Sequence, residues 1–192
     1  MILPVVSFGN SVLKQKAADI AADYPNLEKL IADMYETMYA AGGVGLAAPQ
    51  INLGIRLFVV DATPFAEEDS KADGFRKVFI NPVIVERNEE KTMFEEGCLS
   101  FPGIHEEIFR PSVIRIKYLD ENFQAFEETY DKILARIIQH EYDHVEGILM
   151  VDHISNLKKI IIKRRLKELT LGQVSVKYKM LFPSLRRSSV KA

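Results

Sequence analysis

The sequence predicts an α+β fold, in which mixed or antiparallel sheets pack around a central helix and a further helix follows near the C-terminus. Apolar residues recur at helical spacing in three stretches, residues 26–41, 131–145 and 156–169. The strand-like segments come mainly between these helices and not in regular βαβ units, which disfavours a parallel sheet. At 192 residues, with 47% hydrophobic and 27% charged residues, the chain has the size and composition of one globular domain.

The first half of the chain predicts one helix, one strand and one loop. The helix runs from Asn26 to Ala41, with Asn26 as its side-chain cap and Gly42-Gly43 as its stop. Ile55 to Val60 is a short apolar run before Asp61, which predicts a strand. Residues 63–74 are polar and include acids and a proline, so they predict a surface loop.

The second half predicts two strands, two helices and a tail. The strands are Val78 to Val85 and Val113 to Leu119, and apolar residues alternate along the second. Asp131 to Val145 is the central helix, and Asn156 to Leu169 is a basic helix. The apolar stripe of the basic helix is expected to consist of Leu157, Ile160, Ile161, Leu166 and Leu169. We expect residues 1–170 to form a single catalytic domain and residues 171–192 to form a basic, loosely ordered tail.

Charge is distributed unevenly although the net charge is only −2. Residues 1–156 hold 14 basic and 26 acidic residues, whereas residues 157–192 hold 11 basic residues and one acid, Glu168. A basic end on an acidic body favours a polyanionic partner such as nucleic acid, and a merely solvated tail is the alternative. Met1 to Asn10 has no basic leader and no stretch is long enough to cross a membrane, so we expect a cytoplasmic protein.

The pattern H-E-x-x-H occurs at His140-Glu141-Tyr142-Asp143-His144, within the central helix. Residues four apart share a helix face, so both imidazoles can bind one metal ion, and Glu141 can move a proton on a water that the metal activates. Such a site predicts hydrolysis. The alternative is a surface helix with two solvated histidines. Asp143 is expected to be an ion-pair partner, and His153 to be structural.

The same helix stripe continues through Ile137 and Ile133. An apolar specificity pocket beside the metal is one interpretation of these isoleucines, and ordinary core packing is another. A catalytic metal site also needs a third protein ligand. Downstream, neither candidate fits well. Met150 stands where a metzincin has its third histidine, and Glu168 lies among lysines and arginines. Upstream, the single cysteine, Cys98, is either a small core residue or a thiolate ligand.

The segment Gly43-Val44-Gly45-Leu46-Ala47-Ala48-Pro49-Gln50 superficially matches a dinucleotide-binding pattern. That interpretation fails because the segment follows a helix and runs into a proline, whereas the motif must follow a strand and open a helix. We therefore expect no dinucleotide. The glycines more plausibly expose backbone groups to an extended ligand, and Gln50 could donate a hydrogen bond to a developing oxyanion.

Three motifs taken together resemble the bacterial peptide deformylases. They are G-V-G-L-A-A-P-Q at residues 43–50, E-G-C-L-S at 96–100 and Q-H-E-Y-D-H-V-E-G at 139–147. The resemblance extends to Ile2-Leu3-Pro4-Val5 and to Arg110-Pro111, so it covers about residues 1–155.

This resemblance implies an enzyme that removes the formyl group from the N-terminal formylmethionine of newly made polypeptides and releases formate. It implies one divalent metal ion, Fe²⁺, for which Zn²⁺, Ni²⁺ or Co²⁺ can substitute; ligand preference alone would suit zinc. The implied metal ligands are Cys98, His140 and His144. The implied catalytic groups are Glu141 as general base and acid, with Gln50 and the backbone N–H of Leu99 as oxyanion donors. The implied substrate-binding residues are Val44, Gly45 and Gly97 beside the peptide, and Phe94, Ile133 and Ile137 around the methionine side chain.

The sequence departs from the family pattern in two places, and it allows two rival functions. Many relatives carry arginine near His105 to meet the substrate backbone, and no recognised motif covers the chain after Gln173. A zinc endopeptidase that uses His140, His144 and Glu168 is one rival function. A non-enzymatic ribosome-associated protein is another, although an intact Glu141 argues against it. For the enzyme itself, the basic C-terminal segment predicts docking near the ribosomal exit.

Overall fold

The computed structural model describes residues 1–183. Its helices are α1 (Leu27–Ala40), α2 (Lys132–Glu146) and α3 (Asn156–Thr170). Its strands are β1 (Val5–Val6), β2 (Gly45–Ala47), β3 (Leu57–Asp61), β4 (Arg76–Arg87), β5 (Lys91–Gly97), β6 (His105–Pro111), β7 (Val113–Leu119), β8 (Ala125–Asp131) and β9 (Met180–Leu181). Across residues 1–183, no helix combines the length and the apolar content that crossing a membrane requires.

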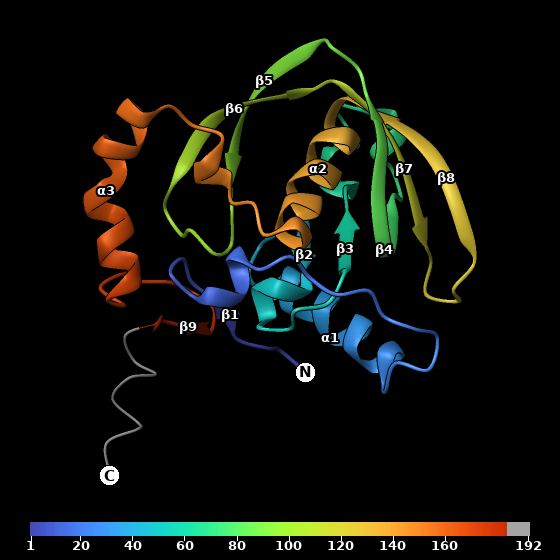
Figure 1. Cartoon of the computed structure of the whole chain (residues 1–192), viewed down its shortest axis with the longest axis horizontal. Coiled ribbons are helices and arrows are strands. Elements are labelled where there is room, and N and C mark those ends of the chain that lie inside the picture. Colours follow the sequence, from blue (N-terminus) through green and yellow to red (C-terminus); the bar gives the residue numbers. More distant parts are fainter. Residues whose placement is uncertain (184–192) are drawn as a thin grey trace.

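The strands form three sheets. The largest is antiparallel, with the order β2-β3-β4-β7-β8, while β5 and β6 form a separate antiparallel pair and β1 and β9 a parallel one. Helix α2 lies at the centre of the molecule, between the large sheet and the β5–β6 pair (Figure 1). The predicted α+β fold, with sheets around the helix that carries H-E-x-x-H, is therefore confirmed.

The two faces of the large sheet support two different hydrophobic cores. Alternate residues of β3 point to opposite faces, as the two-residue period of a strand requires. Phe58 and Val60 pack with α2, whereas Leu57 and Val59 pack with α1. Burying one such side chain stabilises the fold by roughly 1.5–3 kcal/mol. Helix α2 is thereby fixed against the sheet along one side, which leaves its other side for the β5–β6 pair.

Helix α1 and the predicted strands occur where expected, with shifted ends. Asn26 precedes α1, but it has left-handed backbone angles (φ 55°) and its side chain makes no capping hydrogen bond, so the predicted side-chain cap is wrong. A capping side chain needs an extended backbone at that position, and asparagine tolerates the left-handed one instead. The predicted loop at 63–74 contains two short 3₁₀ turns, Thr63–Phe65 and Ser70–Ala72, and buries Ala72.

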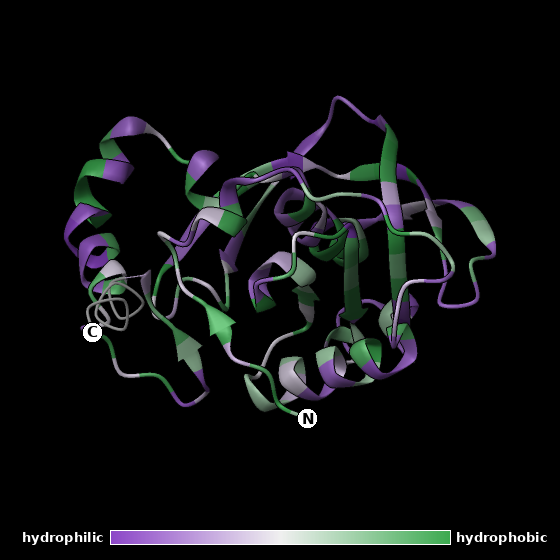
Figure 2. Ribbon diagram, turned by 60° about the horizontal axis from the view of Figure 1, so that its bottom comes forward, coloured by the Kyte–Doolittle hydropathy of each residue, from purple (hydrophilic) through white to green (hydrophobic). Residues whose placement is uncertain are grey.

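Helix α3 exposes most of its predicted apolar stripe. Leu157, Ile160 and Ile161 are 68%, 68% and 70% exposed, whereas Ile162 and Leu169 are buried. These three positions are exposed because α3 stands at the edge of the molecule (Figure 1), and the buried side of the helix includes Ile162, which the predicted stripe left out. Hydrophobic and hydrophilic segments therefore both appear around α3 in Figure 2.

The segment that follows α3 packs on the body as far as residue 183, which differs from the expected loose tail. Strand β9 pairs with β1, and the backbone N–H of Ser7 donates to the carbonyl of Leu181 at 3.0 Å. The side chain of Asn10 donates to the same carbonyl at 3.1 Å. The remainder of the expected tail, residues 184–192, lies outside the described residues.

Candidate metal centre

The side chains of Cys98, His140 and His144 converge on one point. Their possible ligand atoms all lie within 4.8 Å of one another. Cys98 Sγ is 3.3 Å from His144 Nε2, close to the roughly 3.5 Å that separates a sulfur and a nitrogen ligand around a tetrahedral ion. Helix α2 supplies both histidines, and Cys98 directly follows β5. Two imidazoles, one thiolate and a free fourth position suit a catalytic divalent metal.

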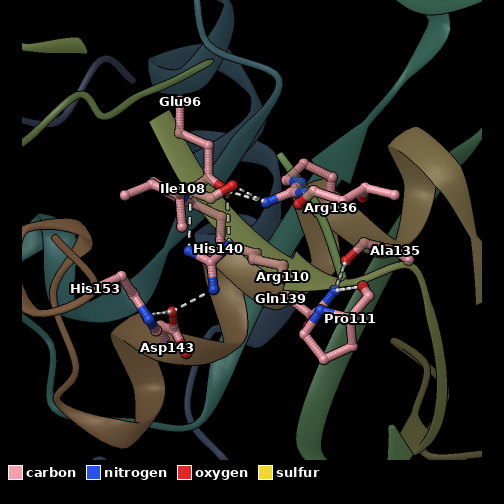
Figure 3. Close-up of polar contacts among 11 residues, drawn as sticks. Glu96, Ile108, Arg110, Pro111, Ala135, Arg136, Gln139, His140, Asp143 and His153 are labelled. Carbon is pink, nitrogen blue, oxygen red and sulfur yellow. Dashed lines mark hydrogen bonds and ion pairs between the residues drawn. The ribbon is translucent and has the colours of Figure 1, made fainter. Parts of the chain in front are cut away.

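A buried carboxylate orients one of the histidines. Glu96, the residue two before Cys98, lies with Oε2 at 2.9 Å from Nδ1 of His140 (Figure 3). Because Nδ1 is engaged, Nε2 is left for a metal, as in many carboxylate–histidine–metal arrangements. Arg110 and Arg136 donate to the same carboxylate at 2.7 and 3.0 Å. Burial alone would raise the pKa of Glu96, but the hydrogen bonds and charges of His140 and Arg110 hold that pKa well below its usual range.

The network continues from Glu96 to Asp143, which lies three residues after His140 on α2. Arg110 also donates to Asp143 at 2.6 Å, and Nε2 of His153 lies 2.7 Å from the same carboxylate (Figure 3). The expectation that Asp143 serves as an ion-pair partner is confirmed, and His153 contacts Asp143 and not the cysteine–histidine cluster. A chain of polar contacts therefore reaches from His153 to Nδ1 of His140, the ring nitrogen opposite the one that is left for a metal.

The two histidines have opposite pKa shifts. Burial, together with the charge of His140, lowers the pKa of His144 to about 3, so His144 is neutral and ready to bind a metal. Burial also opposes the charged form of His140, but hydrogen bonds to Cys98 and Glu96 outweigh it and raise its pKa. Since only the neutral ring coordinates a metal, His140 must release its proton when an ion binds.

Glu141 is enclosed beside this cluster. It is 4% exposed, and Oε2 has no hydrogen-bond partner among the described residues. Burial raises its pKa to about 7. Gly45 lies directly against it, since a Cβ at that position would approach Glu141 Cδ to 2.7 Å. A carboxyl group with a pKa near neutrality can both accept and return a proton at physiological pH.

Gln50 is held so that its amide nitrogen faces the cysteine. It lies in the 3₁₀ turn Ala48–Ile51, and its Oε1 accepts a hydrogen bond from the backbone of Ala47 at 2.8 Å. Its Nε2 is therefore on the opposite side, 3.5 Å from Cys98 Sγ and 3.5 Å from Ser100 Oγ. This orientation makes Gln50 a donor into the site.

These residues surround a cavity of about 470 Å³. All the predicted site residues except His144, which is buried behind it, line this cavity: Val44, Gly45, Gln50, Phe94, Gly97, Cys98, Leu99, Ile133, Ile137, His140 and Glu141. His105 also lines the cavity, and a Cβ on Gly97 would approach its ring to 2.7 Å. Glu168, the alternative ligand, pairs instead with Arg164 on α3 at 2.9 Å.

Several residues of the site were not predicted. The roles of Glu96, Arg110 and Arg136 went unrecognised, although Glu96 and Arg110 stood within the quoted motifs. The signal available for Glu96 was a charged residue inside a motif, two positions before the candidate ligand Cys98. Tyr178, which also lines the cavity, had no signal in the sequence.

The chain is similar to known proteins over nearly its whole length. The sequence model of the family described as polypeptide deformylase matches residues 2–160. A peptide deformylase of Christiangramia forsetii is 49% identical over 195 residues, which covers 98% of this chain and 100% of that relative. One of Flavobacterium johnsoniae is 48% identical over 194 residues and covers 97% and 99%.

Solved structures agree with these sequence relatives. The crystal structure of a peptide deformylase from Legionella pneumophila has a TM-score of 0.77 and 38% identity, covering 90% of this chain and 98% of that one. The crystal structure of peptide deformylase 1B from Arabidopsis thaliana, in complex with an inhibitor, has a TM-score of 0.79 and 32% identity, covering 89% and 92%.

Proposed function

The chain belongs to the peptide deformylase family, and on that premise we propose how its residues perform the reaction. The protein is a metal-dependent enzyme that removes the N-formyl group from nascent peptides. One observation carries the assignment of residues: the cluster of Cys98, His140 and His144 shares a single cavity with the buried Glu141 and with Gln50. Residues 1–170 would supply every group proposed below for metal binding and catalysis.

Cys98, His140 and His144 are the proposed ligands of one divalent ion. Fe²⁺ is the proposed native ion, and Zn²⁺, Ni²⁺ or Co²⁺ would substitute, because thiolate and imidazole ligands accept each of them. Held there, such an ion would supply a water with a pKa lowered towards neutrality and would act as a Lewis acid. Glu96 supports this site by keeping Nε2 of His140 available for coordination.

Glu141 is the proposed general base and acid. Its carboxylate takes a proton from the attacking water as the C–O bond to the formyl carbon forms. The same proton then passes to the departing amine as the C–N bond breaks, and the products are formate and a free N-terminus. The pKa of about 7 supports this double role, since a proton can be taken and returned with little cost near that pH.

Two donors are proposed to stabilise the negative charge on the formyl oxygen. One is Nε2 of Gln50, which the hydrogen bond from Ala47 orients. The other is the backbone N–H of Leu99, next to the ligand Cys98. Removal of one preorganised oxyanion donor typically lowers kcat by about 10²–10³.

The peptide is proposed to bind along β2. That strand lies at the edge of the large sheet, so its outer side can pair with an extended chain at Val44 and Gly45. Gly97 and His105 line the cavity as the end pair of the β5–β6 ladder. The methionine side chain is proposed to enter the apolar wall formed by Phe94, Ile133 and Ile137. A formyl carbon carries only hydrogen, so a narrow site rejects larger acyl groups by shape.

The direct test is anaerobic purification with metal analysis, followed by an assay for formate released from a formyl-methionyl peptide. We expect one equivalent of metal and formate release that depends on it. Cys98→Ser should lose the metal, whereas Glu168→Ala should retain both metal and activity. Cleavage of internal peptide bonds without formate release would instead support the endopeptidase.

The C-terminal helix is proposed to bring the enzyme to the ribosome, where its substrate emerges in the cytoplasm. Helix α3 exposes Lys163 and Lys167 as well as Leu157, Ile160 and Ile161, a combination suited to an RNA and protein surface. Co-sedimentation with ribosomes should weaken as salt increases. Lys163→Glu with Lys167→Glu should reduce it, whereas Lys14→Glu with Lys91→Glu, the same change of charge on exposed residues elsewhere, should not. Equal binding by both variants would contradict the proposal.

A further inference from the structure

Tyr178 joins the C-terminal segment to residues 98–101, the catalytic loop that follows β5. It lies beyond residues 2–160, the part that matches the family model. Its hydroxyl donates to the backbone carbonyl of Leu99 at 2.7 Å, and its side chain lines the cavity that holds Cys98 and Glu141. Burial raises the pKa of Tyr178 to about 12, so the phenol is a protonated donor throughout the physiological range.

The segment that carries Tyr178 is held by the strand that follows it. Met180 and Leu181, two and three residues further on, pair with Val5 and Val6 of β1. The chain that continues from β1 then contacts the catalytic loop directly, because the backbone N–H of Phe8 donates to the carbonyl of Ser100 at 2.9 Å. The carbonyls of Leu99 and Ser100 are therefore held by two neighbouring segments that themselves form one small sheet.

The contact at Leu99 matters for catalysis because Leu99 lies between the proposed metal ligand Cys98 and the glycine segment that begins at Gly43. Leu99 follows the ligand Cys98, and its side chain lies against Gly43, where a Cβ would approach Leu99 Cδ1 to 2.9 Å. With its carbonyl and its side chain both held, rotation of Leu99 about its backbone bonds is restricted. Its backbone N–H is consequently held in one direction relative to the cavity.

We propose that Tyr178 is a positioning residue for deformylation, whose hydroxyl holds Leu99 in the conformation that presents its N–H to the oxyanion. The inference rests on the oxyanion role proposed above for Leu99. Through Tyr178 the C-terminal segment would help to position an oxyanion donor. This role is separate from any contact of α3 with other molecules.

Tyr178→Phe tests this directly, because it removes the hydroxyl and keeps the ring in the cavity. We expect kcat for a formyl-methionyl peptide to fall about fivefold or more, the effect of at least one ordinary hydrogen bond, with KM and bound metal unchanged. Amide hydrogen exchange in residues 98–101 should become faster. Tyr39→Phe is the matched control, since it removes a tyrosine hydroxyl that donates to Asp61, and it should change neither kcat nor exchange in 98–101.

Three results would overturn the proposal: kcat equal to that of the wild type, loss of metal, which would place the effect on Cys98, or a rise in KM alone. If the unchanged kcat came with a lowered Tm, Tyr178 would have a purely structural role. The wild-type rate in the same assay decides the proposed function separately, because absence of formate release there would refute deformylation whatever Tyr178 does.

Discussion

Oε2 of Glu96 lies 2.9 Å from Nδ1 of His140, which makes one buried carboxylate the support of a metal ligand. The same carboxylate accepts hydrogen bonds from Arg110 and Arg136, two arginines that are 3% and 5% exposed. Removing it would therefore leave two buried cations with less compensation and one histidine without its orienting partner.

We predict that Glu96→Ala lowers the free energy of unfolding by about 3–5 kcal/mol, the usual consequence of breaking a buried ion pair. We also predict a loss of metal affinity of roughly 10–100-fold. Urea unfolding and metal titration measure the two effects. The control is Glu86→Ala, whose partner Arg115 lies on the surface, where a pair contributes less than about 1 kcal/mol. Unchanged metal affinity in Glu96→Ala would show that His140 needs no such support.

The second prediction concerns pH and Glu141. In the metal-free protein burial raises the pKa of this carboxyl from 4.5 to about 7, so its ionisation opposes folding. The stability associated with the protonated form is present below pH 4.5 and is lost as pH rises to about 7, by roughly 3 kcal/mol in all. Glu141→Gln cannot ionise and should escape this loss.

Urea unfolding of the two metal-free proteins between pH 5 and 8 measures the difference. Glu141→Gln should become progressively more stable than the wild type up to about pH 7, and the gap should then level off. A gap that stays constant with pH would mean that Glu141 has an ordinary pKa. In the metal-loaded enzyme the same variant should release no formate, because glutamine cannot accept the proton.

The third prediction concerns the end of α2. Gly147 has a φ of 76°, and a Cβ there would lie 2.9 Å from backbone carbons of Lys14 and Gln15. Gly147→Ala should therefore cost more than the roughly 1 kcal/mol of left-handed strain alone. Gly74 has a similar φ of 64° with nothing within 4 Å of a Cβ, so Gly74→Ala isolates that strain. Thermal unfolding should show the larger loss for Gly147→Ala, and equal losses would exclude a steric contribution.

Sequence patterns predicted those parts of the fold whose burial follows a simple period. The alternation along β7 and the helical spacing in α1 reflect one buried side each, and the structure confirms them. Helix α2 also occurs where predicted, but it is buried around most of its circumference. The face of α3 could not be chosen in this way, because Ile160, Ile161 and Ile162 are consecutive and point in different directions. Strands β5 and β8 were missed since most of their side chains are exposed and many are charged.

The site residues were likewise predictable only where a local sequence pattern marks them. Cys98, His140 and His144 stand within recognisable motifs, and the structure brings them together. Arg110 of β6 and Asp143 of α2 are 33 positions apart in the sequence. Their contact could not be predicted, because no local spacing of residues indicates it. The contact of Tyr178 with Leu99 spans 79 positions and depends on the pairing of β9 with β1, so it required the folded chain.

The last prediction concerns the absence of a side chain at Gly45. A Cβ at this position would come within 2.7 Å of both Cγ and Cδ of Glu141, so the buried side chain of Glu141 would have to shift from its place in the cavity. Gly45→Ala should therefore lower kcat, while Cys98, His140 and His144 still retain the metal. Gly54→Ala is the matched control, since nothing lies within 4 Å of a Cβ there. Steady-state formate release and metal analysis on both variants check this, and a Gly45→Ala enzyme with wild-type kcat would mean that Glu141 can act from a displaced position.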